Sequence, residues 1–369
     1  MMMPSSGTNK LPHGAWRVVV FLFIVGALNY IDRNMLVTMR SSIVESIPMS
    51  DAQFGMLTSM FLWIYGLLSP IAGYFADKFK RSPVIIISLV VWSAVTWMTG
   101  HATNYNQLLI CRALMGISEA FYMPAALALI TDYHRGPTQS FATGINLAGV
   151  MIGSSLGFIG GWLAEMYHWG LAFSIFGVIG IVYAIILFFF LKDVPESDPE
   201  PVLASSSAPE RPGRKKGTEE VLFTDALKKL FSNTTFLFLL VFWSILGLVN
   251  WLIVAWLPTY YKGTLNLSQS VAGVYATAYF YPASIVGLLA GGFFADRWSK
   301  SNLRARVYVP LIGLIIAAPS VFFGSMTTIL TLAVFFFLMY GLTCKFSDSN
   351  MMPVLCLISD NRYRATGYG

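Results

Sequence analysis

Charged residues are scarce in this sequence. Only 11% of the 369 residues are Asp, Glu, Lys or Arg, whereas about 25% is usual for a soluble chain. The formal net charge is +6, but the basic residues are few and stand in short, separate clusters. Such clusters do not make the continuous basic surface that nucleic acid requires. We therefore expect no nucleic-acid partner.

Cysteine and histidine are also rare. The three cysteines are an odd number, and Cys111 and Cys356 lie inside apolar runs, where a thiol is a small apolar side chain. This excludes a domain built on disulfides. The four histidines stand near expected loops without metal-ligand spacing, and the sequence has no phosphate-binding loop and no nucleophile beside a base. We expect no enzyme activity, no metal and no organic cofactor.

Apolar side chains, by contrast, make up 56% of the sequence. Runs of about 20 such residues can cross a hydrocarbon core of about 30 Å, and they must be helical because lipid offers no partner to the backbone. We predict ten spans. They are centred near residues 16–38, 53–76, 84–101, 106–131, 139–164, 170–191, 235–260, 269–295, 305–323 and 327–357. The fold class is therefore an all-α membrane protein.

The distribution of Lys and Arg predicts the orientation. With the N-terminus inside, nineteen of the 24 basic residues lie in cytoplasmic segments and two, Arg40 and Lys262, lie in the opposite loops. Cytoplasmic loops carry this excess in membrane proteins. We expect a multi-pass protein of the plasma or bacterial inner membrane, surrounded by lipid and monomeric, with a cytoplasmic N-terminus.

The chain resembles itself on the two sides of its one long hydrophilic stretch. Residues 24–30 match 245–251, and residues 73–78 match 292–297. In addition, Glu119 stands five residues before Pro124, as Asp348 stands five residues before Pro353. A parallel repeat of a six-helix unit is typical of two-half transporters. We predict a six-helix bundle over residues 1–192, a cytoplasmic linker over 193–233 and an incomplete bundle of four helices over 234–369. On this basis we expect the chain to hold ten of the twelve spans of a longer protein.

Two motifs resemble those of a known superfamily. Gly73-x-x-x-Asp77-Lys78-x-Lys80-Arg81 is similar to the signature loop of the major facilitator superfamily, and Arg112-x-x-x-Gly116 is similar to a second motif. This resemblance implies the major facilitator fold, with two pseudo-symmetric six-helix bundles and alternating access.

Within that superfamily, the segments 29–33 and 116–120 resemble the organic anion:cation symporters of galactonate, hexuronate and sialic acid. Spinster-like lipid transporters share the first of these patterns. In span five, the segment 153–157 has no proline, which disfavours a drug:proton antiporter.

Six ionisable residues fall inside the predicted spans: Asp32, Arg33, Arg112, Glu119, Lys345 and Asp348. A charged side chain facing lipid at mid-membrane costs at least about 2.5 kcal/mol, so each should face a partner or a substrate. Salt bridges that only position helices are the alternative interpretation. Lys345 and Asp348 are three residues apart on one helix and can neutralise each other.

The four ionisable residues of the first part are predicted to form one cluster. Arg112 and Glu119 are seven residues apart, which places them on one helix face about 10.5 Å apart along the axis. Gly116 between them allows a neighbouring helix to approach closely, and Asp32 and Arg33 are the expected partners. Burial favours a protonated carboxyl group and a nearby guanidinium favours the carboxylate, so such a carboxylate can take up and release a proton.

The resemblance assigns roles to these residues. It implies that Asp32 and Glu119 carry protons and that Arg33 binds the substrate, for which its two-pronged guanidinium is suited. The full set of substrate-binding candidates is Arg33, Tyr30, Tyr65, Arg112, Asn146, Asn250, Trp251, Lys345 and Asp348. The gating candidates of the two signature loops are Gly73, Asp77, Lys78, Arg81, Gly292, Asp296 and Arg297.

The sequence thus predicts proton-coupled symport of a small organic anion, with the proton as coupling ion. Spinster-like proton-coupled export of a lipid and facilitated transport without proton coupling are the alternatives. A membrane receptor that binds without transport is a third class.

Overall fold

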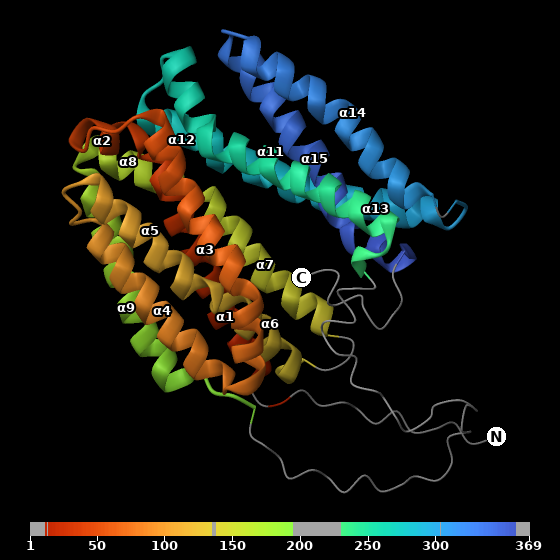
Figure 1. The fold of residues 1–369 in the computed structure, drawn as a ribbon, viewed down its shortest axis with the longest axis horizontal. Coiled ribbons are helices and arrows are strands. Elements are labelled where there is room, and N and C mark those ends of the chain that lie inside the picture. Colours follow the sequence, from red (N-terminus) through yellow and green to blue (C-terminus); the bar gives the residue numbers. More distant parts are fainter. Residues whose placement is uncertain (1–11, 13, 135–137, 195–229, 303, 359–369) are drawn as a thin grey trace, which may run out of the picture.

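The helices that cross the membrane form two groups along the chain. The computed structural model describes residues 12, 14–134, 138–194, 230–302 and 304–358. Within these residues, ten helical segments are long and apolar enough to span a membrane, at the positions that the sequence predicts. Figure 1 shows the first group in red to yellow-green and the second in green to blue.

The first bundle contains six spans and one short helix. The spans are α1 (Ala15–Thr38), α3 (Asp51–Lys78), α4 (Arg81–Thr99), α5 with α6 (Tyr105–Ala120 and Tyr122–Tyr133), α7 with α8 (Gln139–Ser155 and Phe158–Met166) and α9 (Trp169–Phe190); the short α2 (Arg40–Ser46) follows α1. The start of α3 is fixed by a capping box, in which Ser50 Oγ accepts from Gln53 N at 3.2 Å and Gln53 Oε1 accepts from Ser50 N at 2.8 Å.

The second group contains four spans. They are α11 (Thr234–Leu265), α12 with the π-helical segment η1 and α13 (Gln269–Val274, Tyr275–Tyr279 and Phe280–Ser299), α14 (Ala305–Met326) and α15 (Leu330–Ile358). Ser268 Oγ accepts from Val271 N at 3.4 Å and so caps α12.

Prolines explain two interruptions inside spans. Pro124 has no N–H to donate to the carbonyl of residue 120, and α5 gives way to α6 at Phe121. Pro282 likewise leaves the carbonyl of residue 278 without its usual donor, next to the wider turn of η1. Short π-helical turns inside α-helices are frequent at functional sites.

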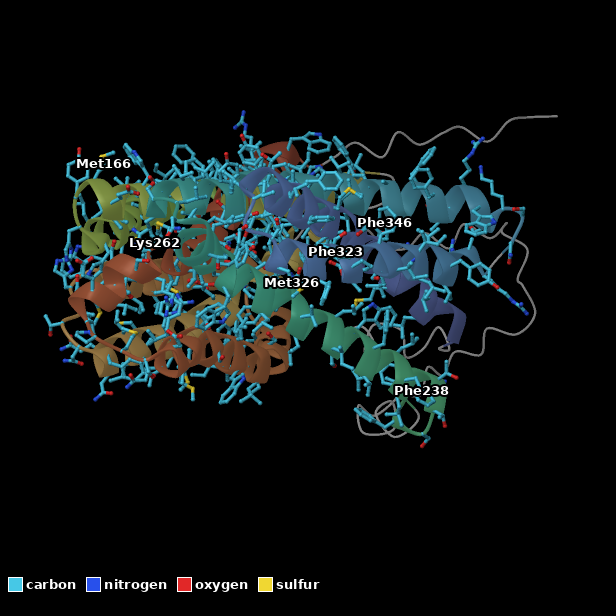
Figure 2. All side chains as sticks on the ribbon, turned by 90° about the horizontal axis from the view of Figure 1, so that it is seen from above. Met166, Phe238, Lys262, Phe323, Met326 and Phe346 are labelled. Carbon is cyan, nitrogen blue, oxygen red and sulfur yellow. The ribbon has the colours of Figure 1, made fainter. Side chains whose placement is uncertain are left out.

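The two bundles meet at one end and diverge toward the other (Figure 1). We call the end where α9 finishes and α11 begins the linker end, and the opposite one the far end. Among the described residues, the hydrogen bonds that join the bundles lie at the far end or near mid-span: Ser42–Gln269, Gly161–Gln269, Glu165–Ser270 and Asn34–Tyr281. Figure 2 shows the Lys262 end of α11 near the first bundle and its Phe238 end projecting away.

Candidate functional site

The centre of the candidate site is an ion pair buried between α1 and α5. Arg33 Nε lies 2.7 Å from Glu119 Oε2, and the two residues are only 8% and 0% exposed. A buried pair of this kind is weak evidence for stability, because desolvation of the two charges offsets much of their attraction. Inside a membrane span it is instead a candidate for function.

Aromatic rings surround the guanidinium of Arg33. Its Cζ atom lies 4.5 Å from the ring centre of Tyr30, 4.6 Å from that of Phe61 and 4.8 Å from that of Tyr65. Phe61 and Tyr65 stack on each other along α3. These cation–π contacts stabilise the charge of Arg33 where water is scarce. The structure therefore places Tyr30 and Tyr65, two predicted binding residues, directly against Arg33.

The other two charges of the predicted cluster lie beside this pair. Thr96 Oγ1 donates to Asp32 Oδ2 at 3.1 Å, and Arg112 interacts electrostatically with both Asp32 and Glu119. Arg112 Nη1 contacts Met115 Sδ at 3.1 Å. The predicted cluster of two carboxylates and two guanidinium groups is thus present. Asp32 Oδ1 and Arg112 Nε are buried and have no hydrogen-bond partner among the described residues.

Close packing of helix backbones positions the cluster, but the helix that packs against Gly116 is not the predicted one. We expected Gly116 to admit the helix of Asp32 and Arg33; it admits α3 instead, because a Cβ at Gly116 would lie 2.8 Å from Phe61 O. Helix α1 approaches along α7 and α8, where a Cβ at Gly160 would lie 2.7 Å from Met35 Cγ. Small residues at such crossings let helices pack closely.

The charged pair of the second bundle is local. Lys345 Nζ lies 2.7 Å from Asp348 Oδ2, and the two side chains are 17% and 46% exposed. The pairing along one helix is the one predicted from the three-residue spacing.

The sequence analysis did not select Thr96 and Phe61, which contact the cluster as described above. It also did not select Tyr281 of α13, whose Oη donates at 2.9 Å, across the two bundles, to Oδ1 of Asn34, the residue after Arg33. The position of Tyr281 directly before Pro282, in a span interrupted by η1, is a signal that could have identified it.

Other predicted binding residues lie outside the cluster. Asn146 is fully buried and its Oδ1 accepts from Tyr122 Oη at 3.3 Å, so it cannot touch a ligand in this conformation. Asn250 and Trp251 lie on α11. Asn250 Oδ1 is buried and has no hydrogen-bond partner in the described part of the chain, and Trp251 is 38% exposed. Within that part, neither residue takes part in the hydrogen bonds, ion pairs or ring contacts of the cluster.

The gating candidates lie at the linker end. Arg81 Nη1 pairs with Asp132 Oδ2 at 2.8 Å, and Asp193 Oδ1 accepts from the backbone N–H of Arg81 at 2.9 Å. Gly73, Asp77 and Lys78 lie on α3, but the surroundings of these three residues fall outside what the structure describes.

In the second bundle, Asp296 Oδ1 lies 3.7 Å from Arg306 Nη2, and Arg297 lines an apolar pocket with Phe294 and Phe346. Gly292, one of the gating candidates, does not lie at a close helix crossing in this conformation. A Cβ at Gly292 would lie 3.8 Å from Ser349 Cβ, an ordinary contact, whereas one at Gly291 would lie 2.7 Å from Phe346 Cα.

Comparison with known proteins finds one matching family and several similar transporters. The model of the Major Facilitator Superfamily matches residues 22–369. Protein spinster homolog 1 of Xenopus tropicalis is 27% identical over 324 residues, which cover 82% of this chain and 58% of the relative. The hexuronate transporter of Bacillus subtilis (strain 168) is 25% identical over 302 residues, covering 81% of this chain and 67% of the relative. The D-galactonate transporter of Escherichia coli O6:H1 is 26% identical over 292 residues, covering 75% and 66%.

A solved structure shares the fold. It is described as a bacterial homolog of the human lysosomal transporter Spinster in an inward-facing and unoccupied conformation. It matches with a TM-score of 0.82 at 24% identity, covering 97% of this chain and 78% of that one. The predicted fold class is confirmed. The chain spans only 58% of the length of the spinster relative.

Proposed function

We propose that this chain, which belongs to the Major Facilitator Superfamily, carries a small organic anion such as a sugar acid across the membrane together with protons. The observation that supports this proposal most is the Arg33–Glu119 ion pair, buried at membrane depth within a ring of aromatic side chains. Relatives named as hexuronate and D-galactonate transporters agree with an acidic sugar as the substrate class.

The coupling follows from competition for Arg33. Glu119 occupies Arg33 Nε while it is ionised, and a substrate carboxylate needs the same guanidinium. When Glu119 takes up a proton, its attraction for Arg33 falls and the guanidinium becomes available for the substrate. Substrate and proton therefore bind together. Release of the proton on the other side restores the ion pair and expels the anion.

Asp32 supplies a second site for a proton. It precedes Arg33 on α1, is 3% exposed, and interacts electrostatically with Glu119 and Arg112. Two protons carried with a substrate of one negative charge move one net positive charge inward. Because the membrane potential contributes about 2.3 kcal/mol per charge per 100 mV, it would then drive uptake.

The arrangement of the bundles fits one stage of alternating access. The basic residues assign the linker end to the cytoplasm, and the bundles diverge toward that end while they are joined at the far end (Figure 1). We infer that the structure is an inward-facing state of the transport cycle.

Neutralising Glu119 tests the proposal. In proteoliposomes of the full chain with D-galactonate, Glu119→Gln should abolish uptake driven by an imposed pH gradient and the inward current, because the glutamine cannot carry a proton. Exchange of labelled for unlabelled galactonate should persist, because exchange needs no net proton movement. Glu45→Gln, at an exposed position of α2, is the matched control and should transport like the unchanged protein.

Equal pH-driven uptake by Glu119→Gln and the unchanged protein would contradict proton coupling and favour facilitated transport. Binding of galactonate without any flux would favour a receptor.

The similarity to spinster proteins supports a second candidate, the export of an amphipathic lipid. Competition separates the two. If sugar acids block labelled galactonate uptake and lysophospholipids do not, the anion symporter stands; the reverse result would favour the lipid exporter.

A further inference from the structure

An apolar pocket opens between α13, α14 and α15 of the second bundle, and its lining includes no residue of the cluster around Arg33. Val309 and Phe346 are buried in this pocket, at 4% and 9% exposure, whereas Phe294 and Ile312 are 53% and 45% exposed. The pocket is therefore open on the side where the helices face lipid. It has a volume of about 510 Å³ and is lined by Phe294, Arg297, Trp298, Val309, Ile312 and Phe346.

The internal repeat shows what fills the corresponding place in the first bundle. Phe294 corresponds there to Phe75, and the ring of Phe121 packs on Phe75 with ring centres 5.8 Å apart. The residue that corresponds to Phe121 is Asn350, whose amide is buried and donates to Phe346 O of its own helix at 2.9 Å. The second bundle thus has a small amide where the first has a ring, and space remains beside Phe294.

Basic residues follow one another along this pocket. Arg297 forms part of its wall, and Lys300 and Arg304 come within the next seven residues. All three are exposed. In the described part of the chain none of the three forms an ion pair, and the acidic residue of this segment, Asp296, lies 3.7 Å from Arg306 instead. The mouth of the pocket therefore carries uncompensated positive charge.

Two aromatic rings mark the level of the membrane surface at this place. Trp298 ends α13 and Tyr308 lies in the first turns of α14, with ring centres 5.8 Å apart. Such rings lie at the level of the lipid headgroups, and the basic residues assign this end of the helices to the cytoplasm. A basic pocket between spans on the cytoplasmic side is suited to an anionic lipid headgroup.

We propose that this pocket binds one anionic phospholipid of the cytoplasmic leaflet, with the phosphate against Arg297 and an acyl chain between Phe294 and Ile312. The chain gives little preference of its own, because it exchanges lipid for equally apolar side chains. The headgroup gives the selectivity. A guanidinium holds a phosphate by two hydrogen bonds, and Lys300 and Arg304 favour a headgroup with a net negative charge. The lipid is a bound component of the second bundle and not cargo, so this site does not depend on the substrate at Arg33.

Native mass spectrometry of the purified full chain tests the proposal by counting retained lipids. Palmitoyl-oleoyl phosphatidylglycerol and palmitoyl-oleoyl phosphatidylcholine are matched probes, because they share their acyl chains and phosphate and differ in net charge. Phosphatidylglycerol should be retained in preference by roughly fivefold or more, as expected for each basic residue near an anionic headgroup. Arg297→Gln should reduce this preference, and Arg297→Lys, which keeps the charge, should preserve most of it.

Ile312→Trp tests the pocket separately from the charge. The larger side chain fills the pocket from its exposed wall, so retention of both lipids should fall although every basic residue is still present. Arg17→Gln is the matched control. Arg17 is an exposed cation on the same side of the membrane, next to Trp16, which is 40% exposed, as is Trp298. This variant should retain both lipids like the unchanged protein.

The contrary outcomes are distinct. Equal losses of phosphatidylglycerol in Arg17→Gln and Arg297→Gln would mean general attraction to a positive surface, which would overturn the site. Retention that neither Arg297→Gln nor Ile312→Trp lowers would overturn it as well. Retention that falls only with Arg33→Gln would place the lipid among the central charges, which would overturn this inference and favour the lipid exporter.

Discussion

Arg33 is the residue on which the site depends. It combines an ion pair at 2.7 Å with contacts to three aromatic rings, and only a planar guanidinium can satisfy both at once. Glu119 and Asp348 occupy equivalent positions of the internal repeat, but their surroundings differ. Glu119 meets a cation from another helix in a fully buried environment, whereas Asp348 meets one on its own helix and is half-exposed.

Arg33→Lys tests this dependence. We expect the affinity for galactonate to fall by roughly tenfold or more, because the ammonium keeps the charge but loses the forked geometry and the stacking on Tyr30 and Tyr65. Equilibrium binding to the purified protein measures the effect. Arg17→Lys, at an exposed position of α1, should bind normally. Unchanged affinity of Arg33→Lys would contradict direct recognition of the anion by the guanidinium.

At the scale of elements, interruptions and tight crossings set the positions of the charges. The change from α5 to α6 at Phe121 follows directly after Glu119 and Ala120, and Gly116 brings the backbone of α3 against α5, so that Phe61 and Tyr65 reach Arg33. The aromatic ring around Arg33 thus depends on one helix crossing.

Gly116→Ala should therefore destabilise the protein. The added Cβ would lie 2.8 Å from Phe61 O and 3.2 Å from Ile64 Cβ, and overpacking of this kind costs about 1–3 kcal/mol. A thermal melt in detergent should show a lower midpoint. Gly66→Ala on α3 is the matched control, because nothing lies within 4 Å of its added Cβ, and a helical Gly→Ala change is neutral or stabilising by about 1 kcal/mol. Equal midpoints for the two variants would contradict the crossing.

At the scale of the whole molecule, a few polar contacts hold the far end closed. The Gln269 side chain, 6% exposed, accepts from Ser42 N at 3.0 Å and donates to Ser42 Oγ at 2.9 Å and to Gly161 O at 3.3 Å. Glu165 Oε2 accepts from Ser270 N at 2.6 Å beside it. Each of these hydrogen bonds joins one bundle to the other, so it can form only while the far end is closed.

Gln269→Ala should shift the population toward a form that is open at the far end. Loss of buried hydrogen bonds costs about 1–3 kcal/mol, which corresponds to roughly a 5- to 150-fold change in the balance of two states. Spin labels at Glu45→Cys and Lys262→Cys, in a background without the native cysteines, should report longer distances by double electron–electron resonance. Gln107→Ala, whose partner Thr103 lies in the same bundle, should leave the distances unchanged. An identical distribution for Gln269→Ala would show that Gln269 does not hold this end.

The sequence by itself determined the spans, the fold class, the family and the four-charge cluster. It could do so because apolar length and the cost of a buried charge are properties of single segments, and because a seven-residue spacing fixes a helix face.

Only the tertiary structure decided which groups meet. In the folded chain, Arg33 pairs with Glu119, and Asp32 accepts a hydrogen bond from Thr96. Gly116 packs against α3, Asn146 is buried beside Tyr122, and Tyr281 donates a hydrogen bond to Asn34. These contacts join residues far apart in the chain, and their partners depend on how helices rotate and cross, which no local periodicity encodes.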